Sequence, residues 1–158
     1  MPRKRQISIP IVFLALLAGC TGLRNPESLI VQKNLIHQAE KCRGNATCFI
    51  SVKSATPFDW DEMYFFDVGS SRSEREHAVG IKGVEVSDLE GELVFTRSGR
   101  ITHQEPVRTG VEEPLKNEIS FSGLPATGGI LKFASSARFE VQQESSKNGP
   151  YFILKSAQ

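Results

Sequence analysis

Histidine, serine and carboxylate side chains are the groups that most often perform catalysis, and this chain of 158 residues contains all three kinds. Its histidines, His37, His77 and His103, are far apart in sequence, and none lies in a known metal-binding motif. The chain has no G-x-S-x-G or S-x-x-K motif for a serine nucleophile and no glycine-rich phosphate loop. We therefore expect neither an enzyme nor a cofactor. The alternative is an unrecognised hydrolase in which folding brings His77 or His103 beside an acid and a serine.

Four acidic residues near the middle of the chain could bind a cation or act as a catalytic carboxylate pair. They are Asp59, Asp61, Glu62 and Asp67. A calcium loop needs several oxygens on a turning backbone, often with a glycine at the bend. These acids instead alternate with aromatic residues, a spacing typical of a strand with one solvated face. We therefore expect no metal site here.

Three cysteines offer covalent chemistry, and the first has a distinctive context. Cys20 ends the sequence Leu17-Ala18-Gly19-Cys20, which follows a basic start at residues 3–5 and an apolar run from Ile7. A basic start, an apolar segment and small residues before a cleavage point are the parts of a secretory signal. The four residues resemble the lipobox of bacterial lipoproteins. The alternatives are an ordinary secretory signal or an uncleaved anchor, although a bilayer-spanning helix needs about 20 apolar residues.

The lipobox resemblance implies that the Cys20 thiol carries diacylglycerol, that cleavage precedes it and that its new amino group is acylated too. Two or more acyl chains make membrane anchoring stable. In diderm bacteria an aspartate after the cysteine tends to retain lipoproteins at the inner membrane, and Thr21 stands there instead. The resemblance therefore implies the periplasmic face of the outer membrane in a diderm source, and the cytoplasmic membrane otherwise.

Cleavage before Cys20 would change both the length and the charge of the chain. It would leave 139 residues with 16 basic and 18 acidic side chains, a net charge of about −2. A nucleic-acid-binding protein typically has a basic stripe or a pI above about 9, so nucleic acid is not an expected partner. We predict a signal peptide over 1–19, a lipidated tether over 20–25 and a single domain over 26–158, a length usual for one domain.

The remaining cysteines, Cys42 and Cys48, form an even pair in a chain that we expect to be exported. Disulfides persist outside the cytoplasm, and a ring this short would stabilise the fold by about 2 kcal/mol. The alternative is a redox or metal pair, but the spacing fits neither C-x-x-C nor a zinc site. We predict a structural disulfide between Cys42 and Cys48.

The predicted domain opens with an amphipathic helix from Pro26 to about Lys41. Asn25 can cap it, and Pro26 suits its first position. Val31, Leu35 and Ala39 recur one turn apart and predict the buried face. We expect this helix to pack on a sheet. The alternative, a helix lying on the membrane, usually has more Lys and Arg on its polar side.

From Phe49 onward the pattern favours strands. The expected strands span 49–53, 58–68, 92–97, 100–104, 116–121, 130–133, 138–143 and 151–155, with 130–133 equally compatible with a helical turn. Turns are expected at Ser98-Gly99 and Asn148-Gly149, and the capping-box spacing from Ser71 to Glu74 predicts a short helix toward Ala78. The fold class is therefore α+β, with a mainly antiparallel sheet of about five to seven strands and the N-terminal helix packed on it.

Trp60 and Tyr64 dominate the longest predicted strand. We expect them to anchor the core, with an exposed aromatic platform for a sugar or a protein as the alternative. They belong to a wider pattern: Trp60-Asp61-x-x-Tyr64-x-Phe66, then Leu93-Val94-Phe95 and a hairpin centred on Gly99. The pattern resembles small bacterial envelope lipoproteins and exported proteins. That resemblance implies no activity or ligand.

Three classes of function remain open. The first is a noncatalytic envelope lipoprotein that binds another envelope protein or organises an assembly. The second is a periplasmic inhibitor or immunity protein directed against a lytic enzyme or toxin. The third is the unrecognised hydrolase. Of these we expect the first.

Overall fold

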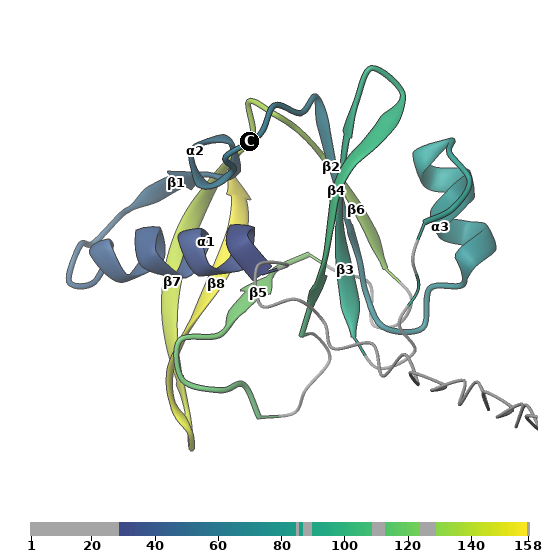
Figure 1. Cartoon of the computed structure of the whole chain (residues 1–158). Helices are drawn as coiled ribbons and strands as arrows, with labels where there is room; N and C mark the ends of the chain where they lie inside the picture. Colours follow the sequence, from purple (N-terminus) through teal and green to yellow (C-terminus); the bar gives the residue numbers. More distant parts are fainter. Residues whose placement is uncertain (1–28, 85, 87–89, 109–112, 124–128, 158) are drawn as a thin grey trace, which may run out of the picture.

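Two four-stranded sheets and three helices make up the part of the chain that the computed structural model describes, residues 29–84, 86, 90–108, 113–123 and 129–157 (Figure 1). The helices are α1 (Ile30–Lys41), α2 (Val52–Ala55) and α3 (Arg72–Val79). The strands are β1 (Phe49–Ser51), β2 (Glu62–Phe66), β3 (Gly91–Arg97), β4 (Arg100–Val107), β5 (Ile119–Phe121), β6 (Ile130–Ala134), β7 (Arg138–Ser146) and β8 (Gly149–Ala157). The predicted signal peptide, Cys20 and the tether lie outside the described residues.

The α+β class agrees with the prediction. The described residues form eight strands in two sheets, however, where about five to seven strands in one sheet were expected. We call the sheet with strand order β1-β7-β8-β5 sheet A, and the sheet with order β4-β3-β2-β6 sheet B. Neighbouring strands are antiparallel except β5 and β8, which are parallel. The two predicted hairpins are confirmed, since β3 pairs with β4 across Ser98-Gly99 and β7 pairs with β8 across residues 147–148.

Helix α1 packs into the core that the two sheets share, through the face that the spacing predicted. Val31, Leu35 and Ala39 are fully buried. The described helix begins at Ile30 with Leu29 as its N-cap residue, and Asn25 and Pro26 lie outside the described residues. No helix in the described part of the chain is long and apolar enough to cross a bilayer.

Three predicted strands are shorter than expected. The strand expected over 49–53 ends at Ser51, because the chain turns there into α2, which buries Val52 and Ala55. The strand expected over 58–68 is only β2, and its flanking residue Asp61 already donates its backbone N–H to Thr96. Residues 116–118 likewise precede β5 instead of belonging to it.

Strand β2 lies at the centre of sheet B, and both of its faces are buried. Met63 and Phe65 lie in the inner core between the two sheets, whereas Tyr64 and Phe66 lie in the outer core under α3. The prediction of a solvated face along this strand is therefore wrong. The physical reason is that helices and strands cover sheet B on both sides, a situation in which a strand loses its polar face.

Helix α3 covers the outer face of sheet B, on the side away from sheet A (Figure 1). It begins with the predicted capping box: the Ser71 hydroxyl accepts the Glu74 N–H, and the Glu74 carboxylate accepts the Ser71 N–H. Gly80 ends the helix with a φ of 73°, a left-handed conformation that favours glycine. These local signals are sufficient to set both ends of α3.

Candidate functional site

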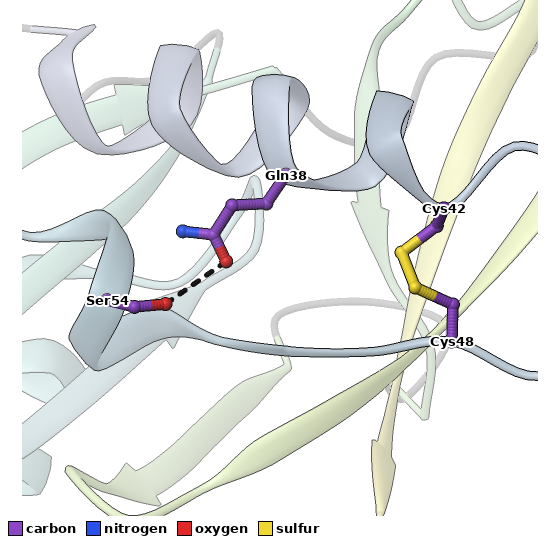
Figure 2. Close-up of a disulfide and its surroundings, with 4 residues drawn as sticks. All are labelled: Gln38, Cys42, Cys48 and Ser54. Atoms are coloured by element: carbon purple, nitrogen blue, oxygen red, sulfur yellow. Dashed lines mark hydrogen bonds between the residues drawn. A yellow bond between two sulfur atoms is a disulfide. The ribbon is translucent and has the colours of Figure 1, made fainter.

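The Cys42–Cys48 disulfide ties the end of α1 to the start of β1, as predicted (Figure 2). The two Cα atoms are 5.5 Å apart. A second link lies nearby, where the Ser54 hydroxyl of α2 donates to the Gln38 side-chain oxygen at 3.1 Å (Figure 2). The end of α1 is therefore held by one covalent link and by polar contacts at Gln38 and Glu40, and the disulfide has a structural position.

A small cavity of about 60 Å³ lies beside the disulfide. It is lined by Ala39, Cys42, Arg43, Gly44, Asn45, Val141, Gln143 and Phe152. The Arg43 guanidinium carbon lies 5.6 Å from the centre of the Phe152 ring, and Arg43 also donates to the Asn117 side-chain oxygen at 2.7 Å. Pockets for organic ligands usually occupy roughly 300–1,000 Å³. This cavity is therefore too small to be a substrate site of that kind.

Trp60 and Tyr64 are both 2 % exposed, so neither forms an exposed aromatic platform. They lie on opposite sides of sheet B, because the chain is not extended between them. Trp60 packs edge-on against Phe95 and donates its indole N–H to the Thr56 hydroxyl at 2.8 Å. The Tyr64 ring stacks with the Phe66 ring, and the two ring centres are 6.1 Å apart. Each ring supports a different core.

The four acidic residues of the middle segment do not gather into one site. Asp59 lies between Lys53 at 3.2 Å and Arg97 at 3.1 Å. The hydrogen bond from Lys53 lowers the pKa of the Asp59 carboxyl, and the charges of Lys53 and Arg97 lower it further. Asp61 accepts the backbone N–H of Ser98 in the β3–β4 turn. Asp67 accepts the N–H of Val68, the residue after it. These contacts are structural.

Glu62, Tyr64 and Lys132 form a polar cluster on the outer face of sheet B. The Lys132 ammonium lies 2.7 Å from a Glu62 oxygen, and the Tyr64 hydroxyl donates to Glu62 at 2.7 Å. The Lys132 hydrogen bond, followed by that of Tyr64, lowers the pKa of the Glu62 carboxyl, and the Glu62 bond raises the pKa of Lys132. Burial, followed by the Glu62 bond, raises the pKa of the Tyr64 phenol. None of the three is therefore prepared to exchange protons near neutral pH.

The three histidines are not brought together. His37 and His77 are exposed on α1 and α3. His103 lies on β4 against the Phe58 ring at 4.7 Å, with its Nε2 3.0 Å from a Glu105 oxygen. Within the described ranges, no three His, Cys, Asp or Glu side chains are placed to hold a metal ion.

Glu105 is a buried group that the sequence analysis missed. Its side chain is completely buried, and its two carboxylate oxygens accept the backbone N–H groups of Val31 at 3.1 Å and Gln32 at 2.8 Å. A helix N-terminus has unpaired N–H groups and a partial positive charge, which a carboxylate stabilises. Glu105 therefore caps α1 from 74 residues away, in place of a capping side chain within the helix. No short-range pattern in the sequence identifies such a contact.

Arg75 is the second missed group, and it lies buried between α3 and sheet B. Its Nε donates to the Ser70 carbonyl at 3.1 Å and to the Ser70 hydroxyl at 3.0 Å. Its Nη1 lies 4.0 Å from a Glu92 oxygen, and its guanidinium carbon lies 5.4 Å from the centre of the Phe66 ring. Arg75 and Glu92 thus form a buried ion pair that attaches α3 to the sheet.

These buried contacts account for the fold and supply no catalytic arrangement of known type. Comparison with protein-family models, with curated proteins and with solved structures finds no match for this chain. The function must therefore be inferred from the residues themselves.

Proposed function

We propose that this protein is a membrane-anchored envelope lipoprotein whose folded domain binds another envelope protein without catalysing a reaction. The sequence Leu17-Ala18-Gly19-Cys20, at the end of an apolar run, carries the proposal. The Cys42–Cys48 disulfide supports it, because structural disulfides persist mainly in exported proteins. The cavity beside that disulfide, of about 60 Å³, is itself too small for a typical organic ligand.

The anchor would also limit where the domain can lie. Nine peptide links separate Cys20 from Leu29, and they can span at most about 32 Å. The start of α1 would therefore stay within that distance of the lipid. The side chain of Gln32 donates to the Pro106 carbonyl, so the adjoining end of β4 would remain near the membrane too.

The lipid anchor is tested by expressing the full chain in a diderm bacterium with isotopically labelled palmitate. We expect label in the wild-type protein and none in Cys20→Ala, which should also leave the membrane fraction. The matched control is the double variant Cys42→Ala/Cys48→Ala, which removes the other two thiols and should keep the label. Label that persists in Cys20→Ala contradicts the proposal.

Partner binding is tested by chemical cross-linking in intact cells, followed by detergent extraction and purification of the full chain. We expect one envelope protein to be recovered in a complex of defined mass from wild type, and to be lost when Cys20→Ala removes the anchor. Recovery of the monomer alone contradicts a binding role. A lytic enzyme or toxin as the sole partner would identify the role as inhibition or immunity.

A further inference from the structure

The two edges of sheet B differ in how they are protected. On β4, Pro106 has no N–H to offer, and its carbonyl accepts the Gln32 side-chain amide. The pairing of β4 with β3 is also irregular between Phe95 and Thr96, a feature that twists an edge away from further pairing. Strand β6, at the opposite edge, is five residues long and has neither a proline nor a register shift.

The backbone of β6 presents hydrogen-bonding groups away from the sheet. At the ends of the β2–β6 pairing, the Gly129 carbonyl accepts the Asp67 N–H, and the Ser135 N–H donates to the Asp61 carbonyl, both at 2.9 Å. Hydrogen bonding alternates along an antiparallel strand. The backbone N–H and C=O groups of Leu131 and Phe133 therefore also face β2, whereas those of Ile130, Lys132 and Ala134 face outward.

The Ala134 carbonyl accepts the Ala137 N–H in the following turn. The outward groups that remain are the N–H and C=O of Ile130, the N–H and C=O of Lys132, and the N–H of Ala134. None of them is hydrogen-bonded to a residue that the structure describes.

The side chains of β6 leave this edge accessible. Lysine on an edge strand usually discourages pairing. Here the Lys132 ammonium turns back over the sheet, 2.7 Å from Glu62 and 5.4 Å from the centre of the Tyr64 ring. On the inner face, Leu131 and Phe133 are only partly buried, and the Phe133 ring lies 4.9 Å from that of Phe139. The edge therefore combines free backbone groups with apolar side chains beside them.

We infer that an extended segment of the partner protein binds along β6 and adds a fifth strand to sheet B. This inference rests on the proposed partner-binding function and specifies its surface. Free N–H and C=O groups at strand spacing are complementary to another extended backbone. Next to Leu131 and Phe133 the added strand would place apolar side chains, and opposite Lys132 it would place an acidic one, since opposite charges stabilise cross-strand pairs.

Charge also favours a different protein over a second copy of this chain. In the register centred on Lys132, two β6 edges paired antiparallel would place two lysines directly opposite each other, each with only its own Glu62 as counter-charge. Like charges in that position destabilise a strand pair. A partner segment with the order apolar, acidic, apolar avoids this repulsion. Its apolar side chains would lie beside Leu131 and Phe133 on the inner face, and its acidic side chain beside Lys132 on the outer face.

The direct test uses the full chain in detergent and the synthetic peptide Thr-Thr-Val-Glu-Val-Thr-Thr as the probe. We expect the peptide to slow amide hydrogen exchange at Ile130 and Lys132. The control peptide carries an N-methyl group on its glutamate, which removes the N–H that would face β6. Because it loses one inter-strand hydrogen bond, we expect its affinity to be lower by up to about tenfold. Equal effects of the two peptides, or no change at β6, overturn the inference.

A pair of proline variants tests the same surface in cells. Lys132→Pro removes an outward N–H of β6, whereas Gln104→Pro removes an outward N–H on the protected edge at β4 and serves as the matched control. We expect Lys132→Pro alone to abolish cross-linking to the envelope partner, with the amides of Leu131 and Phe133 still protected from exchange.

Persistent cross-linking by a folded Lys132→Pro protein overturns the β6 surface and leaves the partner-binding function standing. Absence of any cross-linked protein from wild type contradicts that function instead. A dimer linked through β6 as the only product assigns the edge to self-association and also overturns the inference. If Lys132→Pro fails to fold, the peptide pair decides the matter, because it uses the wild-type chain.

Discussion

Two glutamates are buried on adjacent strands of sheet B, and the protein compensates their charge in different ways. Glu92, on the outer face, is 4.0 Å from the Arg75 guanidinium of α3. Glu105, on the inner face, accepts two backbone N–H groups at the start of α1 and lies 3.0 Å from His103. The outer carboxylate thus has a full opposite charge as its partner, whereas the inner one has a helix N-terminus.

The difference shows that a buried carboxylate can attach a helix to a sheet in two ways. An ion pair joins two side chains, so removal of one leaves a buried charge with its partner missing. A helix N-terminus supplies partial charges from backbone groups that mutation cannot remove. We therefore expect the outer contact to be the more sensitive of the two to substitution.

The largest effect is expected for Arg75→Met, which leaves Glu92 buried without its guanidinium. The free energy of unfolding should fall by about 3–5 kcal/mol, measured by urea denaturation. The double variant Arg75→Met/Glu92→Leu removes both charges and should recover most of that loss. A loss below about 1 kcal/mol in the single variant would show that this ion pair is as weak as a surface pair. It would also contradict the expected difference in sensitivity between the Arg75–Glu92 pair and the Glu105 cap.

Removal of the disulfide should cause the second largest loss of stability. The disulfide holds the C-terminal end of α1, the helix whose N-terminus Glu105 caps. Cys42→Ala/Cys48→Ala opens a short ring and should reduce the free energy of unfolding by about 2 kcal/mol, on the loop-entropy model. Mass spectrometry of the unreduced wild-type protein should show the Cys42–Cys48 link. Equal urea midpoints for the double variant and wild type would show that the ring does not stabilise the fold.

Glu105→Gln should have an intermediate effect on the inner contact. The amide keeps the shape of the side chain but is neutral and has only one acceptor oxygen. One helix N–H therefore loses its acceptor and the other keeps only an uncharged one, at a cost of about 1–2 kcal/mol. Hydrogen exchange at Val31 and Gln32 should accelerate. The control Glu113→Gln changes an exposed carboxylate that pairs with Lys147 at 3.1 Å, and its effect should stay within about 0.5 kcal/mol.

The smallest effect is expected for the partly exposed Glu62 on the outer face. Its pKa is lowered from 4.5, so the ionised carboxylate stabilises the fold above that pH, and this contribution is lost as the pH falls through the lowered pKa. Stability should therefore fall more between pH 6 and pH 3 in wild type than in Glu62→Gln. Because the Glu62 side chain is 41 % exposed, the difference should be under about 1 kcal/mol and shrink in high salt. A difference independent of salt would indicate a buried interaction.

Local patterns predicted the elements that depend on neighbouring residues. The capping box at Ser71 and Glu74, both hairpins and the buried stripe of α1 were predicted correctly, because turn geometry and helical periodicity act over a few residues. The longest predicted strand was wrong at its ends. Alternation continued from Phe58 to Val68, but only Glu62–Phe66 pairs as a strand, with both faces covered.

The outer edge of β6 was also only partly predictable from local patterns. The run over 130–133 was compatible with a strand or a helical turn, and nothing in its sequence indicates whether its outer edge is paired. That property depends on strand order, which places β6 beside β2 at the edge of sheet B. The position of the Lys132 ammonium over Tyr64 depends on the same pairing.

By itself, the sequence determined the class of the fold, the Cys42–Cys48 pairing and the local boundaries of α3, because each rests on composition or on contacts across a few residues. It also supplies the basis for the proposed lipid anchor at Cys20. Only the tertiary structure decided that the strands divide into two sheets, that Glu105 caps α1 and that Arg75 pairs with Glu92. These contacts join distant segments, and a side chain's identity does not reveal which distant backbone or charge the fold will bring to it.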